Sequence, residues 1–221
     1  MAESLTYFEL GTQTPKAVII CFHGLGASAR KLADAMMQLT AHPHLRFVFP
    51  DAPIRPVTVN QGLPMRAWYD IRGFGFDASE DDIGLRSTHS LLEPLVQDQI
   101  NRGITAQQIF LAGFSQGGAL ALYSGLRFAQ RLAGIIALSG YLPRPMLLAR
   151  EANSTNRQTP IFMAHGLHDT VLLPALARYS YECLQALHYP VEFYTYPMDH
   201  CVCNQEVDDL ITWLHKVVPE L

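Results

Sequence analysis

The stretch Gly113-Phe114-Ser115-Gln116-Gly117 places one serine between glycines. It matches G-x-S-x-G, a sharp strand-to-helix turn that exposes a serine hydroxyl above a sheet. We expect a side chain at either glycine to collide with a neighbouring strand or helix. The apolar run IFLA before the motif and the helical pattern GGALALYSGL after it supply the context that the motif requires. Ser115 is therefore a candidate nucleophile.

A serine hydroxyl becomes a good nucleophile when a base removes its proton, and the chain offers nine histidines. In proteins with this serine turn, an acid and then a histidine follow the serine along the chain. Asp169 comes just after the strand-like run PIFMAHG, and His200 comes just after the run VEFYTYP. Both are expected at carboxyl ends of strands, on the same rim as Ser115. The pattern favours these three residues over any other set.

Several other residues could fill the roles of base and acid. His165 lies inside an apolar run and is expected to be a hydrogen-bonded core histidine, whereas His168 neighbours the candidate acid and stays open as an alternative. His188 and His215 fall in predicted helices away from the rim, which favours surface roles. Asp199 is a rival acid, but a carboxylate on the residue next to the histidine is badly placed to orient its ring.

The run FHGLG, residues 22–26, follows the first strand-like run. Negative charge forms on the carbonyl oxygen during acyl transfer, and preorganised backbone N–H groups stabilise it. In this architecture the donors are the residue after the nucleophile, here Gln116, and a residue of an early loop after a strand. Leu25, flanked by glycines, is the candidate for the second donor. A tight turn is the alternative interpretation of FHGLG.

Six short apolar runs are typical of strands buried on both faces of a parallel sheet: AVIICFHG, RFVFPDAP, IFLAGFS, GIIALSG, PIFMAHG and VEFYTYP. Helical spacing occurs between and after them, over residues 27–39, 79–101, 116–129, 174–188 and 204–217. Ser79, with Asp82 three residues later, predicts a helix start. The alternation predicts an α/β fold with a mostly parallel, doubly wound sheet flanked by helices. Its chemistry is expected at the carboxyl ends of the strands.

Residues 52–78 do not fit this alternation. They contain several prolines and glycines and no clear period, but many apolar side chains. Long irregular loops in compact domains are often lids or binding loops. The alternative is a segment packed on the core with hidden secondary structure, although a binding role is favoured for its aromatic members. The apolar residues are Ile54, Val57, Val59, Leu63, Met65, Trp68, Tyr69, Ile71, Phe74 and Phe76.

The composition indicates a folded chain that does not bind nucleic acid. Of 221 residues, 49% are hydrophobic and 16% charged, and the net charge of −4 comes without a basic stripe that could neutralise phosphates. We expect no export signal, because AVIICF is too short and too far from the first residue. No run approaches the ~18 apolar residues that span a bilayer. We therefore expect one soluble domain over residues 1–221.

The cysteines indicate a reducing compartment, which favours the cytoplasm. Cys21, Cys183, Cys201 and Cys203 are too few for a disulfide scaffold, and no CxxC pair suggests a zinc site. The pair Cys201 and Cys203 could be redox-active, but two buried thiols are favoured. No metal or organic cofactor is expected.

Taken together, six blocks resemble the carboxylesterase and acyl-protein thioesterase family of α/β-hydrolases. They are FHGLG, PVTVNQGLPMRAWYDI, LAGFSQGGALALY, ALSGYLP, HGLHDTVLLP and YPMDHCVCNQEVDDLITWL. The resemblance extends over nearly the whole chain, from about residue 17 to residue 214. It implies an α/β-hydrolase fold without a separate cap domain.

The resemblance also implies roles for individual residues. Ser115 would be the nucleophile, Asp169 the orienting acid and His200 the base, with the Leu25 and Gln116 amides as the oxyanion hole. The acyl pocket would be bordered by apolar side chains: Trp68 and Leu172 from the family pattern, and Met65 and Phe74 from the apolar segment.

The expected substrate is an ester or thioester with a hydrophobic acyl group, carried by a small molecule, an acylated protein or a lipid. Carboxylesterase, acyl-protein thioesterase and lysophospholipase stay open within this class. A non-catalytic binding protein on the same scaffold is disfavoured, because it need not keep nucleophile, base, acid and oxyanion loop together. A monomer or weak homodimer is expected.

Overall fold

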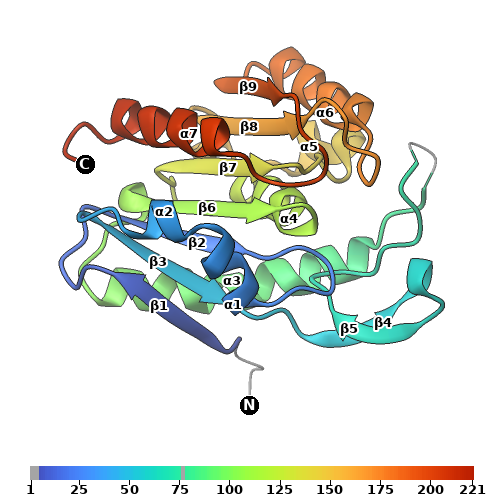
Figure 1. Ribbon diagram of the computed structural model, residues 1–221, viewed down its shortest axis with the longest axis horizontal. Coiled ribbons are helices and arrows are strands. Elements are labelled where there is room, and N and C mark those ends of the chain that lie inside the picture. Colours follow the sequence, from blue (N-terminus) through green and yellow to red (C-terminus); the bar gives the residue numbers. More distant parts are fainter. Residues whose placement is uncertain (1–4, 76–77) are drawn as a thin grey trace.

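A mostly parallel sheet forms the centre of the molecule. The computed structural model describes residues 5–75 and 78–221, and within them seven strands pair in the order β1-β3-β2-β6-β7-β8-β9 (Figure 1). Among these seven strands of the described residues, only β1 is antiparallel to its neighbour. The strands span Tyr7–Gly11 (β1), Ala17–Phe22 (β2), Leu45–Pro50 (β3), Ile109–Phe114 (β6), Gly134–Leu138 (β7), Ile161–Gly166 (β8) and Val191–Tyr196 (β9). The predicted α/β fold is confirmed.

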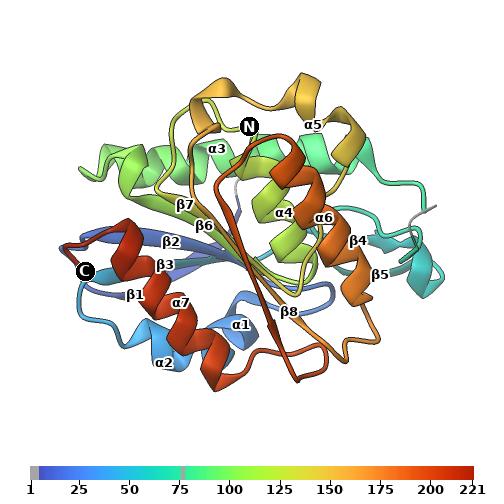
Figure 2. The same ribbon diagram turned by 90° about the horizontal axis from the view of Figure 1, so that it is seen from above.

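Helices cover both faces of this sheet (Figure 2). One face carries α1 (Ala29–Ala35), α2 (Met37–Thr40) and α7 (Asn204–Val217), and the other carries α3 (Asp82–Asn101), α4 (Gln116–Gly125), α5 (Pro145–Glu151) and α6 (Pro174–Ala186). Alternate side chains of β2 enter the two cores: Ile20 and Phe22 pack with α3 and α4, whereas Ile19 and Cys21 pack with α1 and α7. Burial on both faces explains why β2 is continuously apolar.

One predicted helix is broken, and another begins later than predicted. The stretch 27–39 breaks at Met36, whose backbone leaves the helical region (φ −102°, ψ 18°), and so forms α1 and α2. The helix predicted to start at Ser79 begins instead at Asp82, because Asp81 is its N-cap. The Asp81 carboxylate accepts a first-turn backbone N–H at 3.1 Å, and aspartate is among the strongest N-cap residues.

Of the remaining helices and strands, some agree with the prediction and others were not predicted. α7 has the predicted bounds, whereas α4 and α6 end earlier than predicted, at Gly125 and Ala186. β1 and α5 were not predicted. β9 is an edge strand with mostly half-buried side chains, so the expectation that every apolar run is buried on both faces is wrong for this strand.

Residues 52–78 are neither wholly a loop nor wholly core. They contain a two-stranded hairpin of β4 (Ile54–Val57) and β5 (Leu63–Arg66), with a 3₁₀ turn at Thr58–Asn60. Trp68, Tyr69 and Ile71 then enter the main core, which supports the packed alternative for this part. Exposed apolar side chains nevertheless remain at Ile54, Leu63 and Phe74. Phe76 lies outside the described residues.

Candidate active site

Ser115 stands at a sharp turn between β6 and α4. Its backbone is strained (φ 57°, ψ −119°), and its N–H donates to the Leu138 carbonyl at 2.9 Å. A Cβ at Gly113 would overlap the carbonyl group of Gly117, and a Cβ at Gly117 would overlap the Phe22 carbonyl oxygen. The predicted collisions are confirmed. Although Ser115 is the N-cap residue of α4, its hydroxyl makes no capping hydrogen bond, so it is not engaged by the helix.

The acid and the histidine predicted from the later strands are in contact. His200 Nδ1 lies 2.7 Å from Asp169 Oδ2. Because a carboxylate only accepts, Nδ1 carries the hydrogen and the lone pair is on Nε2. Asp169 is buried, and its Oδ1 accepts two backbone N–H groups, from Val171 and Leu172, both at 2.9 Å. The carboxylate is thus fixed on one side by the backbone and on the other by the imidazole.

The His200 ring also packs on the serine turn. Its centroid lies 4.8 Å from that of Phe114, the residue that precedes Ser115. The structure therefore gathers the ends of β6, β8 and β9 at one edge of the sheet. His168 and Asp199, the rival base and rival acid, are both exposed.

His165 is a second histidine beside Asp169. It is fully buried, as predicted for a core histidine, and its Nε2 donates to the Leu172 carbonyl oxygen at 2.8 Å. The same nitrogen lies 3.2 Å from Asp169 Oδ2. Burial lowers the pKa of His165, so the ring is neutral at pH 7. Its contact with Asp169 was not predicted, although the spacing H-x-x-x-D after a strand could have indicated it.

His23 stabilises the FHGLG loop. This buried ring donates from Nδ1 to the Gly24 carbonyl oxygen at 2.8 Å and accepts at Nε2 from the Ala52 N–H at 3.0 Å. Burial lowers the pKa of His23, which keeps the ring neutral and fixes this tautomer. A Cβ at Gly24 would lie 3.4 Å from Ser115 Cβ. The loop that carries Leu25 therefore passes directly beside the serine.

Gln116 supplies both a backbone donor and a side-chain clamp. As the first residue of α4 it has an N–H with no acceptor inside the helix. Its buried side chain accepts from the Trp68 N–H at 3.0 Å and donates to the Tyr69 carbonyl at 2.7 Å. The Trp68 indole N–H in turn donates to the His23 carbonyl at 2.8 Å. Residues 66–69 thus connect the serine turn to the FHGLG loop.

The four predicted substrate-binding residues lie in different surroundings. Trp68 is 0% exposed and packs against Phe22 and His23, so it presents no surface to a substrate in this structure. Met65 is half-buried, with its sulfur close to Gly26 of the FHGLG loop. Phe74 and Leu172 line a cavity.

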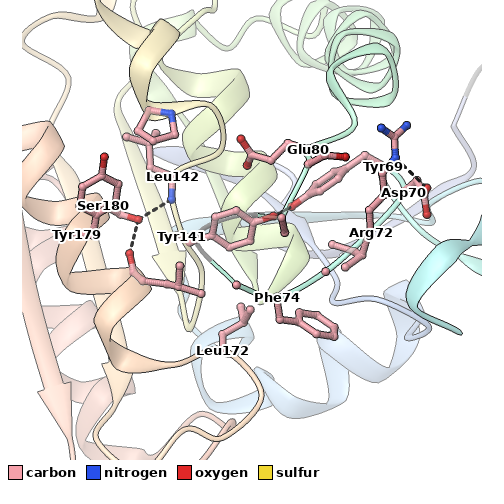
Figure 3. Close-up of a pocket in the computed structure, with 17 residues that line it drawn as sticks. Tyr69, Asp70, Arg72, Phe74, Glu80, Tyr141, Leu142, Leu172, Tyr179 and Ser180 are labelled. Carbon is pink, nitrogen blue, oxygen red and sulfur yellow. Dashed lines mark hydrogen bonds and ion pairs between the residues drawn. The ribbon is translucent and has the colours of Figure 1, made fainter.

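This cavity of about 100 Å³ lies beside the Asp169 loop (Figure 3). Ile71, Leu142, Leu172 and Leu176 give it apolar walls, and Tyr69, Glu80 and Tyr141 add polar groups. Neither Ser115 nor His200 lines it. Two links connect it to the site: the Leu172 N–H binds Asp169, and the Tyr69 carbonyl binds Gln116.

The cysteines are all free thiols within the described residues. Cys21 is buried, but Cys201 is exposed and Cys203 is half-buried, so the prediction of two buried thiols beside His200 is wrong. Among residues 5–75 and 78–221, no three His, Cys, Asp or Glu side chains are arranged to hold a metal ion.

A serine at a strand-to-helix turn of a doubly wound sheet, with an acid and a histidine from later strand ends, defines an α/β-hydrolase. The phospholipase/carboxylesterase family model matches residues 7–218, and the chain belongs to this family. The resemblance read from the motif blocks is confirmed. Members of the family are carboxylic ester hydrolases, and this chain is one.

Two comparisons illustrate the relationship. Acyl-protein thioesterase 1 of Neurospora crassa is 38% identical over 218 residues, which cover 93% of this chain and 88% of that protein. The crystal structure of Zea mays acyl-protein thioesterase 2 superposes with a TM-score of 0.87 at 27% identity, covering 96% of this chain and 99% of that one. No helix of the described residues has the length and apolar character needed to cross a membrane.

Proposed function

We propose that Ser115, Asp169 and His200 form a catalytic triad that hydrolyses esters or thioesters with a hydrophobic acyl group. The observation that carries the proposal is the 2.7 Å contact between His200 and the buried Asp169, beside a strained serine turn. Strained backbone conformations persist mainly at functional sites, where the surrounding structure holds them. The free Ser115 hydroxyl and the Nε2 lone pair of His200 are the groups that acyl transfer needs.

In the acylation step, His200 Nε2 takes the proton of Ser115 as its oxygen bonds to the substrate carbonyl carbon. The bond from that carbon to the alcohol oxygen or thiol sulfur then breaks, and His200 returns the proton to the leaving group. In the second step, His200 takes a proton from water as the hydroxide bonds to the acyl carbon. The bond from that carbon to the Ser115 oxygen then breaks, His200 returns the proton to Ser115, and the carboxylic acid is released. Asp169 holds the ring tautomer and stabilises the imidazolium.

The backbone N–H groups of Leu25 and Gln116 act as the oxyanion hole. Two observations support this role: the FHGLG loop passes beside Ser115, and Gln116 is the first residue of α4, where the helix dipole also favours negative charge. Hydrogen bonds from His23, Trp68 and Gln116 fix the loops before substrate arrives, so the donors need little reorganisation.

The acyl group enters the cavity lined by Leu172 and Phe74. A cavity of about 150 Å³ accepts benzene, so about 100 Å³ holds an acyl tail of roughly four heavy atoms. The leaving group is proposed to be the thiol of an acylated protein, because the related proteins of Neurospora crassa and Mycosarcoma maydis are named acyl-protein thioesterase 1. We further propose that the chain acts as one domain in the cytoplasm, as a monomer or weak homodimer, with its free thiols suited to a reducing compartment.

The test is hydrolysis of matched p-nitrophenyl esters and acyl thioesters, C2 to C16, by the wild type and Ser115→Ala, together with labelling by a fluorophosphonate probe. Ser115→Ala should lower kcat on the order of 10⁶-fold and abolish labelling. The proposed cavity predicts that kcat/KM rises with chain length to about C5 and then levels off. Residual activity within tenfold of wild type would refute the assignment of Ser115.

A further inference from the structure

Two tyrosine hydroxyls meet at the wall of the cavity. The Tyr69 and Tyr141 oxygens lie 3.0 Å apart, and Figure 3 shows the two rings pointing their oxygens toward each other. Tyr69 follows the β4–β5 hairpin and Tyr141 follows β7, so segments far apart in the sequence build this pair. Burial raises the pKa of both phenols, and both therefore keep their hydrogens at neutral pH.

The pair has one more hydrogen-bond donor than it uses. Each phenol carries one O–H, and the contact between the two oxygens consumes one of these hydrogens. Within the described residues, no other hydrogen bond reaches either oxygen. Tyr69 is buried and Tyr141 is half-buried, so a donor left without an acceptor is unfavourable there, and the second hydrogen is available to a group inside the cavity.

The other polar groups around the cavity restrict what that group can be. Ser180 is already engaged, since it accepts from the Leu142 N–H at 2.8 Å and donates to the Leu176 carbonyl at 2.7 Å. The charge of Arg72 is paired with Asp70 and Asp81. The Glu80 carboxylate lines the cavity and accepts the Arg144 N–H at 2.7 Å, and its negative charge would repel an anionic ligand. The available acceptor position therefore suits an uncharged oxygen.

We propose that this cavity selects acyl groups that carry a neutral oxygen acceptor near the end of a short chain, with the Tyr69–Tyr141 pair donating a hydrogen bond to that oxygen. A hydroxyl, an ether or a ketone has the required chemistry, and about 100 Å³ sets the short length. The proposal rests on the proposed function, because it takes the cavity as the acyl-binding site. It adds a specificity that apolar walls alone do not provide.

The test compares acyl groups that differ only by replacement of one methylene with oxygen. The pairs are 3-methoxypropanoyl with pentanoyl and 4-methoxybutanoyl with hexanoyl, each as the p-nitrophenyl ester. The quantity of interest is the ratio of kcat/KM for the ether to that for its methylene partner. Comparing this ratio between wild type and variants cancels the difference in intrinsic reactivity of the two esters.

The decisive variant is Tyr69→Phe combined with Tyr141→Phe, because either tyrosine alone still offers one hydroxyl. We expect the ratio for at least one pair to fall about two- to twelve-fold, the value of one hydrogen bond. Each single variant then shows which hydroxyl reaches the ligand. Tyr194→Phe is the matched control, since it removes a tyrosine hydroxyl that donates to Glu192 on β9, and it should leave the ratio unchanged.

The outcomes separate this proposal from the proposed function. If the wild type hydrolyses pentanoyl and hexanoyl esters through Ser115 but the double variant keeps both wild-type ratios, the inference is overturned and the proposed function stands. If Ser115→Ala retains the wild-type rates, the proposed function fails first. If the double variant does not fold, Tyr69→Phe combined with Tyr141→Met takes its place, because it also removes both hydroxyls, and wild-type ratios for both ester pairs in that variant overturn the proposal.

Discussion

Replacing Gln116 with methionine isolates the clamp that connects the serine turn to the FHGLG loop. The substitution keeps the length of the side chain and leaves the backbone N–H of residue 116 in place. It removes the acceptor for the Trp68 N–H and the donor for the Tyr69 carbonyl. Because Gln116 is only 2% exposed, water cannot readily replace these bonds. Each unpaired buried group costs about 1–3 kcal/mol, so the free energy of unfolding should fall by about 2–6 kcal/mol.

The effect on catalysis should be separate from this loss of stability. If residues 66–69 set the positions of the two proposed oxyanion donors, Gln116→Met should lower kcat at least tenfold, approaching the 10²–10³ that follows loss of one donor. KM should change less than threefold, because Gln116 itself does not line the cavity where the acyl tail is proposed to bind. The assays are urea unfolding followed by tryptophan fluorescence and steady-state kinetics at a temperature where the variant is folded.

Gln108→Met is the matched control. The Gln108 side chain also makes hydrogen bonds at both ends, to the Lys16 carbonyl and from the Thr105 N–H, each at 3.0 Å. It is half-buried at the opposite end of β6, so water can replace its partners and a change within about 0.5 kcal/mol is expected. If Gln116→Met loses no more stability than this control, or keeps kcat within twofold while folded, the clamp does not position the donors.

Three further predictions concern single positions. Trp68→Phe removes the indole N–H that donates to the His23 carbonyl. Because Trp68 is 0% exposed, kcat should fall by a similar factor for every acyl length. A loss confined to longer acyl chains would instead place Trp68 in the acyl pocket. Gly117→Ala forces a Cβ onto the Phe22 carbonyl. The free energy of unfolding, measured in urea, should fall by about 1–3 kcal/mol, and most of the esterase activity should be lost. Wild-type stability and activity would contradict the packing described at the turn. Glu206 is fully buried, neither of its oxygens has a hydrogen-bond partner of normal geometry among the described groups, and burial raises its pKa to about 8. Because the folded protein binds this proton more tightly than the unfolded chain, the free energy of unfolding falls as pH rises from about 4.5 to about 8. Glu206→Gln should therefore raise the melting temperature more at pH 8 than at pH 5. An equal change at both pH values would refute the assigned titration.

The sequence predicts the sheet well because burial on both faces leaves a local signal. Ala17–Phe22 is apolar at every position, since both of its faces meet a core, and so it can be recognised without knowing its neighbours. The same holds for Ile109–Phe114 and the glycine-flanked serine after it. Chain order alone then indicates Asp169 and His200, because the carboxyl ends of parallel strands share one edge. That residues 1–221 act as one domain stays a prediction.

Features that depend on contacts between distant segments could not be predicted in this way. Trp68 and Phe74 look alike in an irregular apolar segment, but one is fully buried and the other lines the cavity. The Tyr69–Tyr141 pair joins residues separated by 72 positions, with no local pattern at either. The side-chain clamp formed by Gln116 also could not be predicted from the sequence, because a glutamine at the start of a helix is equally compatible with an exposed side chain.

The position of β9 at the edge of the sheet affects how the protein loses activity. Within the part of the chain that the structure describes, β9 pairs only with β8, yet it leads directly into the segment that carries His200. Edge elements open locally at a lower free energy than the whole fold. On heating, detachment of β9 and its following segment would separate His200 from Asp169 while the strands around β2 and β6 remain paired. Inactivation should therefore precede the loss of helical circular dichroism, and amide hydrogens of β9 should exchange before those of β6.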